Sequence, residues 1–291
     1  MNELIKNLIK DGPVLTDGSW GSQMLKRGLK GREAPDSWNL THPDAVEEVA
    51  RGYVDAGSRI ILTNTFGSNR YVLGKFDLAD KVVEINTKGV EISKRAAQGN
   101  AYVFASIGPS GKMLVTKEVS QDDLKLAFEE QANAIAMAGA DAIVVETMMD
   151  LNEAIIAAEA AKQTGLPVIA CLVFDSGKQK DRTMMGNTAE QAVDEFSKIG
   201  IDGIGANCGQ GIEGFIPICA QMSAATDLPI WMKPNAGLPD MVAGEVVYNT
   251  TAREFVRFVP DLVKAGASFI GGCCGTDQEF IRAIGKTLAD L

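Results

Sequence analysis

Eight short apolar runs alternate along this chain with longer amphipathic segments. The runs are mostly apolar throughout and do not alternate between polar and apolar residues, as expected of parallel strands that are buried on both faces. Eight such strands, alternating with helices over 291 residues, predict an α/β protein with a (β/α)8 TIM-barrel fold. The predicted strands are residues 14–17, 59–65, 102–107, 142–146, 168–174, 203–207, 230–233 and 269–272.

The segments between these runs carry helix signals. Five of them begin after a residue that can cap a helix and end at or beside a glycine; they are residues 43–56, 121–138, 151–164, 189–199 and 252–265. A short helix outside the barrel is predicted at residues 1–10. A doubly wound open sheet is the alternative fold, but no early strand is followed by the G-x-G-x-x-G turn expected there. No linker or low-complexity segment interrupts the pattern, so we expect one domain over residues 1–291.

The acidic composition argues against several classes of partner. The formal net charge is -10, and an acidic surface repels phosphate backbones and anionic lipid, so we expect neither nucleic acid nor membrane binding. The first residues, MNELIKNLIKDG, lack the apolar run of a secretory signal, and no stretch reaches the ~18 apolar residues of a membrane span. Five cysteines without an export signal predict reduced thiols in the cytoplasm.

Polar and metal-binding residues follow nearly every predicted strand. In a TIM barrel the carboxyl ends of the strands form the functional face. Turns favour Asp, Asn and Gly for conformational reasons alone, which explains some of these residues but not three cysteines at two strand ends. The residues at or just beyond strand ends include Asp17, Thr63, Asn64, Gly108, Glu146, Asn207, Cys208, Asn235, Cys273 and Cys274.

The three cysteines at strand ends predict a metal site. Cys273 and Cys274 are adjacent in GGCCGT, and both can reach one ion only if the backbone bends, which the neighbouring glycines permit. Cys208, in GANCGQG, ends another strand of the same rim. Three thiolates suit zinc, and the lack of a C-x-x-C pair or a nearby histidine indicates an open fourth position, as in catalytic zinc sites. Three buried free cysteines are the alternative.

The remaining cysteines and the single histidine carry weaker signals. Cys171 and Cys219 lie inside apolar runs, so both are expected in the core. His42 stands at the start of a predicted helix, where we expect a surface or capping residue. Metal or nucleophile chemistry in this chain therefore depends on cysteine and carboxylate groups.

Seven segments together resemble a known family. They are LTDGSWGSQM, ILTNTF, SIGPSG, VVETMMD, GANCG, KPNAGLP and GGCCGT, which appear in family order and span nearly the whole chain. The sequence resembles the zinc-dependent homocysteine S-methyltransferases, most of all short bacterial proteins similar to betaine–homocysteine methyltransferase and the homocysteine module of cobalamin-dependent methionine synthase. The resemblance implies methyl transfer to the thiol of homocysteine, which forms methionine.

The resemblance also implies roles for individual residues. Cys208, Cys273 and Cys274 would bind the zinc ion, and Glu146 and Asp17 would contact the amino group of the amino-acid substrate. Zinc at the open position would lower the pKa of the substrate thiol, so that no dedicated general base is required. Three thiolate ligands leave the metal centre with a net negative charge, which preserves the nucleophilicity of the fourth sulfur.

The same resemblance assigns the other polar residues of the rim. Gly108 would lie near the substrate carboxylate through its backbone, and Asn207 and Asn235 would orient the site and the substrate. Thr63 and Asn64 would line the side where the methyl donor binds.

The methyl donor is left open by the sequence. Betaine-like compounds, S-methylmethionine and methylcobamide are the candidates, and the last would arrive on a separate corrinoid protein because this sequence carries no corrinoid-binding module. Trp20, Trp38 and Tyr71 lie in or near loops expected at the barrel mouth, where aromatic faces would attract a cationic donor. The segment TNTFGSNRY departs from the animal betaine enzymes.

Two other functions are compatible with the sequence. A methyltransferase that works with a corrinoid protein could use a different thiol acceptor, and an exposed apolar rim around the barrel mouth would favour it. A barrel that stores or senses zinc without turnover is the other, and a site closed by a fourth protein ligand would favour that function.

Overall fold

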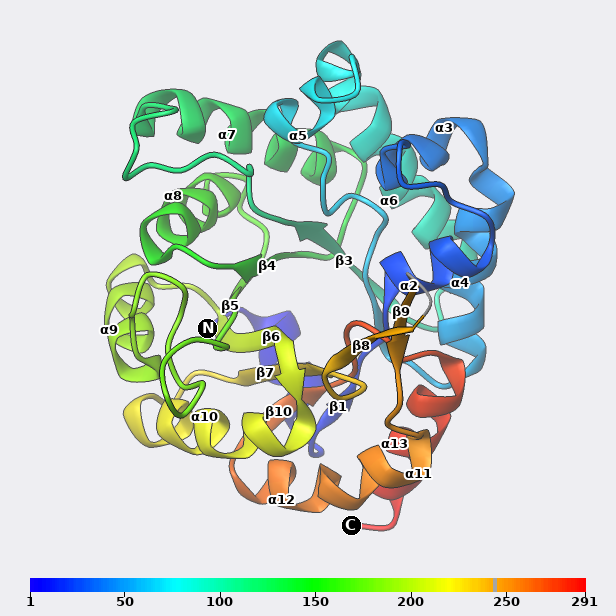
Figure 1. Cartoon of the computed structure of the whole chain (residues 1–291), viewed down its shortest axis with the longest axis vertical. Helices are drawn as coiled ribbons and strands as arrows, with labels where there is room; N and C mark the ends of the chain where they lie inside the picture. The colour runs from blue at the N-terminus through cyan, green and yellow to red at the C-terminus, as the bar shows by residue number, and fades with distance from the viewer. Residues whose placement is uncertain (243–244) are drawn as a thin grey trace.

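Eight parallel strands form one sheet that curves into a barrel (Figure 1). The computed structural model describes residues 1–242 and 245–291. The strand order is β1-β10-β7-β6-β5-β4-β3-β2, and the amide of Arg59 donates a hydrogen bond to the carbonyl of Leu15, which joins the two edges. The predicted TIM barrel is therefore confirmed. The strands are β1 Val14–Leu15, β2 Ile60–Ile61, β3 Tyr102–Ile107, β4 Ala142–Met148, β5 Val168–Leu172, β6 Gly203–Gly211, β7 Ile230–Asn235 and β10 Ala267–Ile270.

A ring of helices surrounds the strands (Figure 1). All five segments with cap and glycine signals contain helix, and the chain also begins with a short helix. The α-helices are α1 Glu3–Ile9, α2 Trp20–Lys26, α3 Trp38–Thr41, α4 Pro43–Asp55, α5 Arg70–Gly74, α6 Val82–Ala97, α7 Gln121–Met137, α8 Leu151–Lys162, α9 Ala189–Ile199, α10 Ile212–Ala225, α11 Ala252–Phe255, α12 Val259–Lys264 and α13 Gln278–Ala289. Among the described residues, no helix is long and apolar enough to cross a membrane.

The segment 252–265 was predicted to form one continuous helix, and this prediction was wrong. The structure divides it into α11, the 3-10 turn η3 (Val256–Phe258) and α12, because Pro260 has no backbone N–H and is accommodated in the first turn of a new helix. Two further 3-10 turns are η1 (Pro35–Ser37) and η2 (Ala79–Lys81).

The first two barrel strands are shorter than predicted because side chains replace the strand ladder near the mouth. The amide of Leu62 donates to the carboxylate of Asp17, 2.7 Å away, so the chain leaves β2 after Ile61. After β7 the chain also forms an antiparallel hairpin, β8 (Pro239–Val242) with β9 (Glu245–Tyr248), which was not predicted from the sequence.

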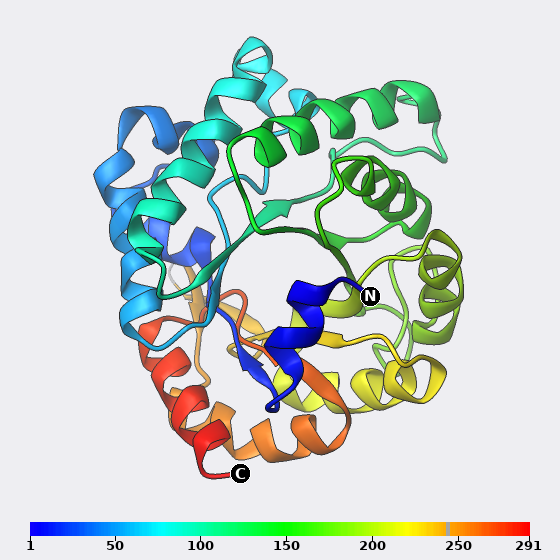
Figure 2. The same ribbon diagram turned by 180° about the vertical axis from the view of Figure 1, so that it is seen from behind.

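The core has two layers, one inside the barrel and one between strands and helices. Inside the barrel, Phe104, Trp231 and Phe269 pack together, with ring centroids 5.2 to 6.2 Å apart for the pairs that include Trp231. Helix α1 crosses the amino-terminal end of the barrel, where Ile5 and Leu8 contribute to this inner cluster (Figure 2). Each of these two buried side chains is worth about 1.5–3 kcal/mol of burial energy. The barrel is therefore closed at the amino-terminal ends of its strands and open at their carboxyl ends.

The positions of the other cysteines and the histidine follow the sequence expectations in part. Cys171 and Cys219 are fully buried in the core, as predicted. His42 is exposed and stacks on Trp38 with centroids 4.4 Å apart, but its side chain caps neither α3 nor α4.

Candidate functional site

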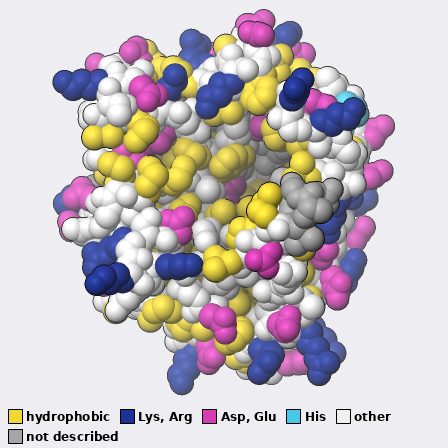
Figure 3. All heavy atoms as spheres, viewed as in Figure 1, with side chains coloured by type: hydrophobic (Ala, Val, Ile, Leu, Met, Phe, Trp, Pro, Cys, Tyr) yellow, Lys and Arg dark blue, Asp and Glu magenta, His cyan; other side chains and the backbone are white. Residues whose placement is uncertain are grey.

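A cavity of about 340 Å³ opens at the carboxyl ends of the barrel strands. The space-filling view shows the molecule hollowed at this point (Figure 3). Its walls come from the carboxyl-terminal parts of β3, β4, β6 and β7 and from segments that follow β1, β2 and β10, so residues far apart in sequence meet there. The cavity wall includes all three cysteines of the predicted metal site.

The sulfur atoms of Cys208, Cys273 and Cys274 converge at this cavity. All three lie within 4.8 Å of one another, and the Cys208 and Cys274 sulfurs are 3.8 Å apart. Zn–S bonds of about 2.3 Å in a tetrahedron place the sulfurs about 3.8 Å from each other, so this donor set fits a zinc ion. The neighbouring Cys208 and Cys274 side chains, and then burial, raise the pKa of the Cys273 thiol. A metal ion bound by this thiol would displace its proton.

Backbone irregularities bring these sulfurs together. Cys208 has φ +62° and Gly209 has φ +82°, where the pairing register between β6 and β7 shifts. Gly275, directly after the cysteine pair, has φ +83°. Gly271 is needed for close approach, because a Cβ there would lie 2.1 Å from the hydroxyl of Thr16. The bend predicted around the adjacent cysteines is therefore present, with the positive φ at Gly275.

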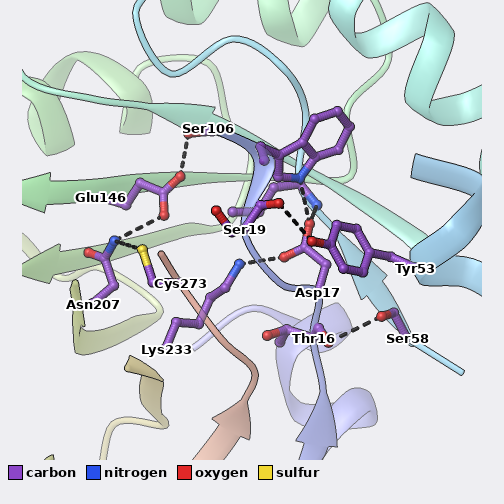
Figure 4. A network of polar contacts seen from close by, with 12 residues as sticks. Thr16, Asp17, Ser19, Tyr53, Ser58, Ser106, Glu146, Asn207, Lys233 and Cys273 are labelled. Atoms are coloured by element: carbon purple, nitrogen blue, oxygen red, sulfur yellow. Dashed lines mark hydrogen bonds and ion pairs between the residues drawn. The ribbon is translucent and has the colours of Figure 1, made fainter. Parts of the chain in front are cut away.

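Asn207 links the cysteine cluster to an acidic residue. Its side-chain nitrogen contacts the hydroxyl of Thr147 at 2.6 Å, the carboxylate of Glu146 at 3.3 Å and the sulfur of Cys273 at 3.9 Å (Figure 4). Its side-chain oxygen accepts from the amide of Thr147, which has φ +60°. These contacts fix the orientation of the Asn207 amide and place Glu146 beside the sulfurs.

Glu146 is the acidic residue nearest the cysteines on the cavity wall. It is 8% exposed, and the hydroxyl of Ser106 donates to its second oxygen at 2.5 Å. Burial raises the pKa of Glu146, while the charge of Lys233 and the Ser106 hydrogen bond oppose that shift. A cationic group that entered the cavity would stabilise the charged carboxylate.

Asp17 lies behind the cavity wall, fully buried. One of its oxygens forms an ion pair with Lys233, and the other accepts from the Trp20 indole and the Leu62 amide, each at 2.7 Å. Lys233 and Trp20 do line the cavity. Burial alone would lower the pKa of Lys233, but the charges of Asp17 and Glu146 raise it, so the ammonium stays charged. The sequence interpretation missed Lys233, whose only signal is a charged residue at the end of an apolar strand.

Thr63 and Asn64 both line the cavity. The Thr63 hydroxyl lies 2.5 Å from that of Thr65 and accepts from the amide of Ser106. The Asn64 side chain donates to the carbonyl of Pro35 at 2.9 Å. Both side chains thus hold the second strand end against its neighbours while they face the cavity.

Gly108 and Asn235 lie outside the cavity wall. The Gly108 amide donates to the carbonyl of Phe66 at 2.8 Å, and a Cβ at Gly108 would meet the Phe66 ring at 2.5 Å. Phe66 itself lines the cavity and is 41% exposed. The side chain of Asn235 accepts from the amide of Cys274 at 3.1 Å, so it holds the adjacent-cysteine turn from behind.

Only one of the three predicted aromatic residues reaches the cavity. Trp20 lines it, but Trp38 is buried elsewhere with its indole bonded to Glu33, and Tyr71 lies under the ammonium of Lys112. Trp38 and Tyr71 therefore do not line the cavity, and the expectation that they would offer aromatic faces to a donor there was wrong. The second aromatic residue on the cavity wall is Phe66, which the sequence interpretation did not single out.

Tyr248, at the end of β9, is a further residue that the sequence did not reveal. A Cβ at Gly275 would lie 2.3 Å from its ring, so Tyr248 packs directly on the turn after the cysteines. Burial, followed by the nearby Cys274 sulfur, raises the pKa of Tyr248. The hairpin that carries this residue was not predicted.

The sequence of this chain matches a known protein family. Residues 14–288 match the model of a family described as homocysteine S-methyltransferase. The chain is 30% identical to the methionine synthases of Mycobacterium tuberculosis and Mycobacterium leprae, over 96% and 95% of its length. It spans about a quarter of the length of these relatives (25% and 24%).

Solved structures show the same fold. The homocysteine methyltransferase MmuM from Escherichia coli, in its metallated form, superposes with a TM-score of 0.82 at 19% identity, over 97% of this chain and 99% of that one. Its oxidised form gives a TM-score of 0.80 at 21% identity, with the same coverage. The match to the family model extends over the barrel and all three cysteines, and the chain belongs to the homocysteine S-methyltransferase family.

Proposed function

We propose that this protein transfers a methyl group to the thiol of homocysteine and thereby forms methionine, with zinc bound by Cys208, Cys273 and Cys274. The observation that carries the proposal is the convergence of these three sulfurs on the wall of a cavity at the functional face of the barrel. Membership of the homocysteine S-methyltransferase family supports the same reaction.

The proposed metal site has three protein ligands and one open position. Zinc held there would lower the pKa of a thiol bound at that position, so a thiolate would form at neutral pH. Asn207 and Asn235 are positioning residues, because one contacts the Cys273 sulfur and the other holds the Cys274 amide. Preoriented ligands with outer partners bind metal more tightly than free ones.

Glu146 is proposed to bind the amino group of homocysteine. Its carboxylate lies on the cavity wall, and Asn207 bridges it to the Cys273 sulfur. Asp17 was predicted to share this role, but both of its oxygens have partners within the protein. We therefore propose that Asp17 acts through Trp20 and Lys233, which it holds in the wall.

The donor is proposed to be a small cationic compound such as a betaine or a sulfonium. Trp20 and Phe66 offer aromatic faces to a positive charge, and the buried carboxylate of Asp36 lies on the same cavity wall. Thr63 and Asn64 complete this side. Attack in line by the substrate sulfur then requires both substrates to be held together in the cavity.

A separate corrinoid protein is the second candidate donor, and one observation favours it. Every loop that borders the mouth from β2 to β5, and the hairpin after β7, exposes large apolar side chains, and Figure 3 shows apolar side chains around the hollow. Such a rim would suit a docking protein that carries a methylcobamide. The exposed residues are Phe66, Met113, Val115, Met149, Met184, Met185, Leu238, Met241 and Val246.

Metal analysis and titration with L-homocysteine test the proposal together. We expect one zinc per chain, loss of that zinc in Cys208→Ala and Cys273→Ala, and release of a proton when homocysteine binds. Cys219→Ala is the matched control, because Cys219 is buried in the core away from the cavity. All five cysteines are free in the structure, so reducing conditions, as in the proposed cytoplasmic location, are used.

The outcomes separate the candidate functions. Zinc with homocysteine binding supports the proposal, and a donor screen then distinguishes betaine, S-methylmethionine and methylcobamide. Zinc without homocysteine binding would favour another thiol acceptor or a barrel that only stores or senses zinc. A protein that binds no zinc with its three thiols reduced would contradict the proposed metal site.

A further inference from the structure

The cavity wall carries more acidic residues than basic ones. Among the described residues that line it, Asp36 and Glu146 are acidic, and Lys233 is the single basic residue. Homocysteine, the substrate of the proposed function, carries one ammonium and one carboxylate on the same carbon. Glu146 could bind the ammonium group, and Lys233 is the basic side chain on this wall that could bind the carboxylate.

The ammonium of Lys233 has hydrogen-bonding capacity to spare. Its side chain is only 3% exposed, and an ammonium group offers three N–H donors. Among the described residues, its single hydrogen-bond acceptor is a carboxylate oxygen of Asp17. Buried donors are rarely left without acceptors, so two N–H groups of Lys233 are available to a ligand in the cavity.

The position of Lys233 suits an amino-acid thiol. In Figure 4 its ammonium end lies between Asp17 on one side and Glu146 and Cys273 on the other. Asn207 connects the Glu146 carboxylate with the Cys273 sulfur through contacts of 3.3 and 3.9 Å. The protein groups that could bind a thiol, an ammonium group and a carboxylate, namely the cysteine cluster, Glu146 and Lys233, therefore lie in one part of the cavity wall.

The other donor expected for the carboxylate is already engaged. The Gly108 amide was expected to lie near the substrate carboxylate, but it donates to the carbonyl of Phe66, and the Phe66 ring covers Gly108. Gly108 also lies outside the residues that line the cavity. A carboxylate in the cavity must therefore find a different partner.

We propose that Lys233 binds the α-carboxylate of the amino-acid thiol and, together with Glu146, selects a substrate that carries both charges. This inference rests on the proposed function, because it places the substrate sulfur at the cysteine cluster. Lys233 then serves two acceptors at once: Asp17 fixes its position, and the substrate uses its remaining N–H groups. A thiol with the amino group but without the carboxylate would lose this contact.

Calorimetric titration of the zinc-loaded protein with two ligands tests the role of Lys233. The ligands are L-homocysteine and 3-aminopropane-1-thiol, which keeps the thiol and the amine but lacks the carboxylate. We expect the wild-type protein to bind homocysteine about 10- to 100-fold more tightly, as for a hydrogen bond to a charged group. In Lys233→Met this preference should disappear, because only the affinity for homocysteine falls.

A second variant guards against a folding defect, since Lys233→Met leaves the buried Asp17 carboxylate without its ion-pair partner. The pair Asp17→Asn/Lys233→Gln removes both charges and keeps polar side chains of similar size. It should lose the preference for homocysteine as the single variant does. Lys94→Met is the matched control, because it breaks a lysine–aspartate pair with Asp141 away from the cavity and should keep the preference.

The results separate this inference from the proposed function. Wild-type protein that binds both ligands equally, or Lys233 variants that lose affinity for both ligands alike, would overturn the role of Lys233 and leave the proposed function standing. Zinc-loaded wild-type protein that binds neither ligand would overturn both. Retained zinc content in the Lys233 variants shows that any loss concerns the substrate and not the metal.

Discussion

At the scale of single residues, chemistry and placement were predictable to different degrees. The three cysteines were singled out because turns favour Asp, Asn and Gly, and this preference does not explain three cysteines at two strand ends. Asp17 and Gly108 were assigned to the substrate, but the structure places both behind the wall, where their polar groups have protein partners. Lys233 and Phe66 could not be inferred, because a strand-end lysine and a loop phenylalanine have no pattern that distinguishes them from ordinary surface residues.

Asn207 is predicted to matter for metal affinity. Asn207→Ala removes the amide that contacts the Cys273 sulfur and bridges Glu146 and Thr147. Loss of such a partner typically weakens metal binding about 10- to 100-fold. Competition with a chelator measures this affinity. Asn86→Ala, which removes another fully buried amide away from the cavity, should lower stability but keep the zinc affinity; equal zinc affinity in both variants would contradict the role of Asn207.

Asp36 is predicted to make stability depend on pH. Burial raises its pKa from the ordinary 3.8 to about 6, against hydrogen bonds from Ser68 and Gly67. Between these values the folded protein holds a proton that the unfolded chain has lost, so stability falls as the pH rises through this range. The ionised carboxylate then costs about 3 kcal/mol above pH 6.

The variant Asp36→Asn isolates this effect, because an amide does not ionise and can still accept the hydrogen bonds of Gly67 and Ser68. Urea unfolding of both proteins at pH 4 and pH 7 should show that the variant gains stability relative to the wild type as the pH rises. A difference in unfolding free energy that stays the same at both pH values would mean that Asp36 has an ordinary pKa.

At the scale of elements, the order of strands and helices followed from the sequence, and their ends did not. The apolar runs located the strands because strands buried on both faces are apolar throughout. The glycines marked where the preceding helices end. The predicted helix 252–265 is interrupted just before Pro260, which lies in the first turn of α12. The predicted 59–65 strand ends early because Asp17 binds the amide of Leu62. The β8–β9 hairpin was missed because its two strands are too short to give a clear alternation of polar and apolar residues in the sequence.

The packing of β6 against β7 is predicted to tolerate no side chain at Gly205. A Cβ there would lie 1.9 Å from the carbonyl oxygen of Trp231, which is backbone and cannot rotate away. Gly205→Ala should cost about 3 kcal/mol or more in unfolding free energy. It should also weaken zinc binding, because Cys208 belongs to the same strand. Gly31→Ala, with open space around it, is the matched control and should change neither quantity; a stable, zinc-replete Gly205→Ala protein would contradict the packing described.

At the scale of the whole molecule, the two ends of the barrel have separate roles. Helix α1 closes one end, and the cavity with its cysteines occupies the other. The sequence predicted that the site lies at the carboxyl ends, because parallel strands direct all these ends to one face. It did not predict that α1 closes the opposite end. The closure of the cavity by residues from seven strand ends depends on side-chain contacts between distant segments, which no local pattern encodes.

This division predicts that stability and metal binding respond to different substitutions. Leu8→Ala, at the closed end, should lower the unfolding free energy by about 2–5 kcal/mol through the lost burial and the space left behind. Its zinc affinity, measured by chelator competition while the protein remains folded, should equal that of the wild type. A folded Leu8→Ala protein with weakened zinc binding would show that the two ends are coupled.

X-ray absorption at the zinc edge, with and without L-homocysteine, tests most directly whether the cysteine cluster forms a metal site that accepts the substrate thiol. We predict three sulfur ligands at about 2.3 Å and one lighter ligand in the protein alone. Addition of homocysteine should replace the lighter ligand, so that four sulfurs surround the zinc. A sulfur count that stays unchanged when homocysteine is added, or that is below three from the start, would contradict the proposed site.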